Sequence, residues 1–112
     1  MKPERRASPR FGCALPVEVL VHGDGGLRRI EATHLCDVSG GGARLISARP
    51  EAYEVGMPVE LRIHRPDGQP VLECPADVVW IGDEADGRAS VSLAMRYLFD
   101  DAALRSMVGE TP

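Results

Sequence analysis

Apolar and polar residues alternate in several short runs of this chain, and glycine or proline residues separate the runs. A period of two predicts strands that bury one face, and frequent turn residues predict that the strands are short. Six strands are expected, at residues 15–22, 28–36, 43–48, 57–64, 71–81 and 90–97. Pro75 is expected to interrupt the fifth strand, because proline cannot donate a hydrogen bond to a sheet ladder.

The end of the chain changes period and predicts a short helix. Asp100 or Asp101 can cap its start, Leu104 and either Met107 or Val108 share one face, and Gly109 can end it. Such a helix is marginal alone, so we expect it to pack on the strands. The predicted fold class is all-β: a six-stranded antiparallel β-barrel with a short C-terminal α-helix. Residues 1–12 are expected to be a flexible, arginine-bearing arm, and residues 13–109 the barrel domain with its helix.

Length and charge narrow the classes of function. A chain of 112 residues is enough for one domain and too short for a cleft between two lobes. Its net charge of −4 argues against a binder of long nucleic acids. Residues 1–10, however, carry four basic side chains and one acidic side chain. A basic arm on an acidic body favours a small anionic ligand.

Several other classes of protein have little support. The three cysteines lie far apart without a C-x-x-C pair, which argues against a disulfide framework or zinc site and favours the cytoplasm. No run approaches the roughly 20 apolar residues of a membrane span. Ser39 does not stand in G-x-S-x-G, and the three histidines fall on different predicted strands. We therefore expect no enzymatic activity, no metal site and no membrane span.

One segment with recognisable chemistry is Arg5-Arg6-Ala7-Ser8-Pro9-Arg10. Arginine can grip a phosphate with two parallel hydrogen bonds and can stack on a nucleobase. Pro9 disfavours helical geometry at Ser8, so Arg6 and Arg10 can reach opposite sides of one ligand. The alternative interpretation is a solvated basic tail.

The other segment is Asp37-Val38-Ser39-Gly40-Gly41-Gly42. Consecutive glycines allow a sharp turn and a close approach of the backbone to a ligand. The carboxylate of Asp37 suits the N–H edge of guanine, and Ser39 can donate to phosphate. The alternative is a plain turn between strands, stabilised by Asp37 and Ser39.

Together the two segments resemble the PilZ family, bacterial receptors for cyclic di-GMP. The family pattern is R-x-x-x-R followed, some twenty to thirty residues later, by (D/N)-x-S-x-x-G. Residues 6–10 match the first motif and residues 37–42 match the second. Residues 78–80 and 95–97 are similar to the family's late strands, although Ala94 and Tyr97 replace a frequent glycine and phenylalanine.

The resemblance implies a role for each matching residue. Arg6 and Arg10 would hold the phosphates and guanine faces, and the barrel side of the site would be Asp37, Ser39, Gly41 and Gly42. Trp80 would lie near a guanine, or would instead be an ordinary aromatic of the core or a strand face. Arg5, directly before the first motif, accompanies a stacked pair of ligand molecules in this family.

The expected function is that of a cyclic di-GMP receptor or adaptor that needs no other cofactor. The arm would close over residues 37–42 when ligand binds, and the change would signal through a partner protein that the sequence does not identify. Two alternatives remain: a PilZ-like protein-interaction adaptor that binds no nucleotide, and a small hydrolase.

Overall fold

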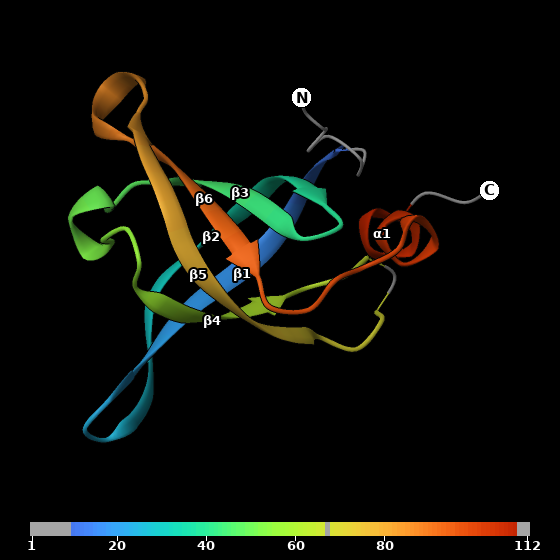
Figure 1. Ribbon diagram of the computed structural model, residues 1–112, viewed down its shortest axis with the longest axis horizontal. Helices are drawn as coiled ribbons and strands as arrows, with labels where there is room; N and C mark the ends of the chain where they lie inside the picture. Colours follow the sequence, from blue (N-terminus) through green and yellow to red (C-terminus); the bar gives the residue numbers. More distant parts are fainter. Residues whose placement is uncertain (1–9, 67, 110–112) are drawn as a thin grey trace, which may run out of the picture.

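The computed structural model describes residues 10–66 and 68–109. Its strands close into one antiparallel barrel in the order β1-β2-β3-β6-β5-β4 (Figure 1). The strands are β1 Phe11–Gly23, β2 Gly26–Ser39, β3 Gly42–Ser47, β4 Pro58–Ile63, β5 Leu72–Asp83 and β6 Ala89–Met95. The 3-10 turns η1 Pro50–Ala52 and η2 Ala85–Gly87 connect strands, and the helix α1 Asp101–Val108 follows β6. The predicted fold class is confirmed. Of the expected flexible arm, residues 1–12, residues 1–9 lie outside the described residues, whereas Phe11 and Gly12 belong to β1.

The core is built as the alternation predicts, from one face of every strand. Among its fully buried side chains are Val17, Leu35, Leu45, Leu61, Ile63, Val78 and Val91. The alternation changes phase once along β1, where Val19 and Leu20 are both buried, because the register with β2 shifts between them. Val21, which the sequence places inside, is only partly buried for the same reason.

The expected interruption of the fifth strand at Pro75 is wrong. β5 runs without a break past Pro75, which pairs with Glu60 of β4. The carbonyl of Pro75 still accepts a hydrogen bond from the Arg96 N–H at 2.9 Å, and pairing along β6 begins at the next residue, Ala76. The missing donor therefore falls where β6 ends, and the ladder tolerates it.

The last strand is shorter than expected at its C-terminal end. β6 ends at Met95, and Tyr97 lies beyond it with 54% of its surface exposed. Gly42 is the first residue of β3 and pairs with Ala94, so the ladder with β3 ends there. Beyond it the Met95 N–H donates to the Gly41 carbonyl and the Phe99 N–H to the Gly40 carbonyl.

The helix α1 is capped as predicted. The Asp100 carboxylate accepts a hydrogen bond from the Ala103 N–H at 2.8 Å, and Gly109 ends the helix with a left-handed φ of 85°. Leu104 and Met107 are buried, which packs α1 against the barrel near the start of β1 (Figure 1). There the Arg105 guanidinium lies 5.2 Å from the centre of the Phe11 ring.

A buried carboxylate fastens the connection between β3 and β4 to the barrel wall. Glu31 of β2 is 8% exposed and accepts hydrogen bonds from the Ser47 hydroxyl at 2.7 Å and the Ala48 N–H at 2.9 Å. The Tyr53 hydroxyl donates to the same carboxylate at 2.7 Å. Each polar group of this cluster is thereby satisfied away from water, as burial requires.

Tyr53 makes the free energy of unfolding of the barrel depend on pH in the alkaline range. Burial, followed by the hydrogen bond to Glu31, raises the pKa of Tyr53 well above its ordinary value of 10.0. Above that value the unfolded chain releases a proton that the folded protein keeps, so the free energy of unfolding falls as pH rises. We expect urea denaturation between pH 9 and 11 to show a steeper loss, approaching about 1.4 kcal/mol per pH unit, than in Tyr53→Phe. Parallel losses in the two proteins would contradict this assignment.

Candidate functional site

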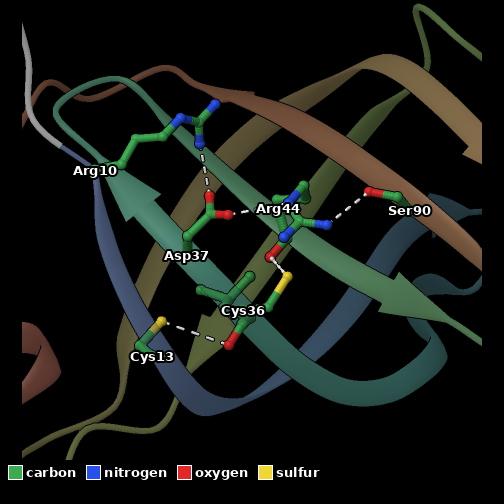
Figure 2. A network of polar contacts seen from close by, with 7 residues as sticks. Arg10, Cys13, Cys36, Asp37, Arg44 and Ser90 are labelled. Atoms are coloured by element: carbon green, nitrogen blue, oxygen red, sulfur yellow. Dashed lines mark hydrogen bonds and ion pairs between the residues drawn. The ribbon is translucent and has the colours of Figure 1, made fainter.

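The structure brings the first motif into contact with the second. Arg10 directly precedes β1, and its Nη1 donates a hydrogen bond to Asp37 Oδ1 at 2.7 Å (Figure 2). The antiparallel pairing of β1 with β2 causes this contact, since Gly12 lies opposite Asp37 and Phe11 opposite Val38. Arg5 and Arg6, the other predicted arginines, lie outside the described residues.

A second arginine, which the sequence analysis missed, holds the other side of Asp37. Arg44 Nε donates to Asp37 Oδ2 at 3.0 Å, and Arg44 Nη1 donates to the Ser90 hydroxyl at 3.2 Å (Figure 2). The hydrogen bond to Asp37 raises the pKa of Arg44. The Asp37 side chain is only 15% exposed, so two guanidinium groups cover a largely buried carboxylate. Gly42 and Arg44 are two residues apart on β3 and therefore share one face of the strand. This spacing was the only signal in the sequence that Arg44 lies at the site, since its pairing with Asp37 depends on strand register.

The polar contacts belong to a row that crosses the outer wall of the barrel. Asp37 pairs with Arg44, Arg44 with Ser92, and Ser92 with Trp80. Neighbouring strands lie about 4.8 Å apart, so the row from β2 to β5 spans roughly 14 Å. Ser92 lies between the arginine–carboxylate group at one end and the indole at the other. We call this row the outer strip.

Trp80 lies on the surface, which excludes a core aromatic and leaves the strand-face aromatic and the residue near a guanine as interpretations. Its surface is 55% exposed, because the register of β5 shifts between Val78 and Trp80 and turns the indole outward. The ring lies directly over Gly82, where an added Cβ would overlap the indole. Gly82 is paired with Ser90, whose hydroxyl accepts the hydrogen bond from Arg44. The indole therefore covers the residue that pairs with the serine bonded to Arg44.

Two glycines of the second motif, Gly41 and Gly42, have close neighbours where a Cβ would lie. Neither Gly41 nor Gly42 has a positive φ, so backbone conformation does not require glycine there. A Cβ at Gly41 would lie 3.1 Å from the exposed Leu98 side chain, and one at Gly42 would lie 3.2 Å from the Leu93 carbonyl oxygen and 3.4 Å from Ser39 Oγ. Side chains at these positions would crowd the turn, so glycine keeps Ser39 close to the backbone of β3.

Two thiols lie beneath the arginine–carboxylate group. Cys13 Sγ donates to the Leu35 carbonyl at 3.5 Å, and Cys36 Sγ donates to the Arg44 carbonyl at 3.3 Å (Figure 2). Burial raises the pKa of both thiols, which therefore stay protonated at neutral pH and are poor nucleophiles.

Within residues 10–66 and 68–109, no cluster of three or more His, Cys, Asp or Glu side chains is arranged to hold a metal ion. In the same part of the chain, no helix has the length and apolar character needed to cross a membrane.

Comparison with known proteins places this barrel in a family. The chain resembles the Bacillus subtilis inhibitor of motility (MotI/DgrA) with a TM-score of 0.66 and 18% identity, over 97% of this chain and 50% of that one. It also resembles the PilZ domain with c-di-GMP of YcgR from Escherichia coli, with a TM-score of 0.64 and 18% identity, over 93% of this chain and 86% of that one.

At this identity the two likenesses show the fold alone, and the chain spans half the length of the motility inhibitor. No curated protein matches the sequence significantly. The PilZ domain family, however, matches residues 4–110, almost the whole length of the chain. The chain therefore belongs to the PilZ domain family.

Proposed function

We propose that this protein is a receptor for cyclic di-GMP that binds the nucleotide on the outer strip. The observation that carries the proposal is the contact of Arg10 with Asp37, which joins the two family motifs at one end of the strip. Half-exposed Trp80 at the other end supports it, since an indole offers a stacking surface for a purine.

The ligand chemistry matches the groups along the strip. Cyclic di-GMP carries two phosphodiester charges and two guanines. Arg10, with Arg5 and Arg6 from the arm, would hold phosphate or stack on guanine, and the Asp37 carboxylate would accept hydrogen bonds from a guanine N–H edge. The tight turn of Ser39, Gly41 and Gly42 would let the ligand approach the backbone closely. Trp80 would cover a guanine.

Arg10 is the group best able to change partners when ligand arrives. Its side chain is 64% exposed, and an exposed ion pair contributes at most about 1 kcal/mol. A phosphate can replace the Asp37 carboxylate as its acceptor at small cost, which would free Asp37 Oδ1 for guanine. The arm would then order across residues 37–42, and a partner protein in the cytoplasm would detect the new surface.

Calorimetry with cyclic di-GMP, and with GTP as a control, tests the proposal. Trp80 is the single tryptophan of the chain, so its fluorescence reports directly on the strip. We expect heat and a change in tryptophan emission with cyclic di-GMP and neither with GTP, and a stoichiometry of one or two ligands per chain. No heat and unchanged emission with cyclic di-GMP would refute the proposal and favour the adaptor that binds no nucleotide. Intact nucleotide after long incubation would exclude the hydrolase.

A further inference from the structure

Arg44 is held on both sides before any ligand is present. Its Nε is bonded to Asp37 at 3.0 Å and its Nη1 to Ser90 at 3.2 Å, and Ser90 itself is 3% exposed. A guanidinium carries five N–H donors, so these bonds leave others for a ligand. The side chain is 36% exposed, which makes it accessible from the strip.

Arg44 and Asp37 together present a hydrogen-bond donor beside an acceptor. The Watson–Crick edge of guanine carries the complementary sequence: N1–H and the N2 amino group donate, and the adjacent O6 accepts. A carboxylate alone satisfies only the donors. Adenine has an amino group in place of O6 and an acceptor at N1, so it would set donor against donor and acceptor against acceptor.

We infer that Arg44 is a specificity-determining residue, which donates to guanine O6 while Asp37 accepts from N1–H and N2. This inference rests on the proposed function, because it assumes that a guanine reaches Asp37. Arg10 is poorly suited to the same task, since it is 64% exposed at the end of the arm and is needed for phosphate. Arg44 belongs to a strand of the closed barrel, and its two bonds fix the plane of its donors in advance.

The test compares three cyclic dinucleotides by calorimetry against the full chain and its Arg44→Met variant. Cyclic di-GMP carries O6 and N2, cyclic di-IMP keeps O6 without N2, and cyclic di-AMP lacks O6. We expect Arg44→Met to weaken cyclic di-GMP and cyclic di-IMP alike by about 10- to 100-fold. The affinity for cyclic di-AMP should stay within about twofold of the unmodified chain, because no productive contact with O6 is lost.

Two further variants separate the donor role from charge and from folding. Arg44→Lys keeps the positive charge but lacks the planar guanidinium donors. We therefore expect this variant, like Arg44→Met, to lose the preference for guanine. Arg62→Met is the matched control, because Arg62 is 41% exposed on β4, across the barrel from β3, and pairs with Glu18 and Glu73. It should not change any of the three affinities.

Each outcome decides the question. Equal weakening of all three ligands by Arg44→Met, or full rescue by lysine, would overturn the inference and leave Arg44 as a general cation of the site. If Arg44→Met fails to fold, the lysine variant alone carries the test, and a retained guanine preference would overturn the inference. An unmodified chain that binds none of the three ligands would refute the proposed function, and the inference with it.

Discussion

An Asp37→Ala variant is expected to lose affinity for cyclic di-GMP by at least about 100-fold. Asp37 bonds both Arg10 and Arg44 and is the acceptor proposed for guanine. Hydrogen bonds to charged groups contribute about 1.5–3 kcal/mol each, and the loss of two corresponds to roughly 100-fold or more in affinity. Calorimetry, or displacement of a fluorescent cyclic di-GMP analogue, measures the change.

Arg10→Ala should reproduce the loss from the other side of the ion pair. Glu73→Ala is the matched control, because Glu73 is an acidic residue of β5, 70% exposed, whose partner is Arg62 and not a residue of the strip. Thermal unfolding of each variant separates lost binding from lost structure. If Arg10→Ala and Asp37→Ala both bind as the unmodified chain does, the receptor assignment is wrong and the adaptor alternative gains support.

Glu31→Ala is expected to destabilise the barrel by about 3 kcal/mol, although it is outside the proposed ligand site. The change leaves the Ser47 hydroxyl, the Ala48 N–H and the Tyr53 hydroxyl without their acceptor, and Ser47 and Tyr53 are buried. A buried unsatisfied polar group costs about 1–3 kcal/mol, and partial rearrangement keeps the sum below the maximum. A loss of this size should lower the Tm by about 10–20 °C in a domain of this length.

Urea and thermal denaturation check this expectation against a neighbouring control. Glu51 lies in the same connection and its side chain is 75% exposed, so Glu51→Ala should change stability by less than about 0.5 kcal/mol. The folded fraction of Glu31→Ala should still bind cyclic di-GMP with unchanged affinity. A loss below about 1 kcal/mol would show that the cluster does not hold the connection as the geometry implies.

Much of the fold follows from local patterns in the sequence. Period-two alternation predicts the first, fourth and sixth strands most clearly, because each buries one face in the barrel, and the capping residues Asp100 and Gly109 predict the ends of α1. The two motifs predict that Arg10 and Asp37 belong to one site, and the structure places them in contact. Their role in ligand binding stays a prediction.

What the sequence could not predict depends on how strands align. The register shift between Val78 and Trp80 turns the indole toward solvent, and no residue type in β5 predicts that shift. Arg44 looks like any polar residue on an outward face until the pairing of β2 with β3 sets it beside Asp37. Gly41 and Gly42 of the second motif also looked like a means of turning the chain, whereas the structure places the Leu98 side chain, the Leu93 carbonyl and Ser39 Oγ close to where their Cβ atoms would lie.

The closed ring of strands limits how another protein can read this domain. Since β4 returns to β1, every strand of the barrel has hydrogen-bonded neighbours on both sides over part of its length, and free backbone edge is left only where a strand extends past its neighbour, as in the outer part of the β1–β2 hairpin. Within the ring itself, recognition would therefore depend on side chains and on the segments that flank the barrel. Because the closed barrel does not need to change shape, the proposed exchange of partner by Arg10 would alter the surface charge of the domain without moving its strands.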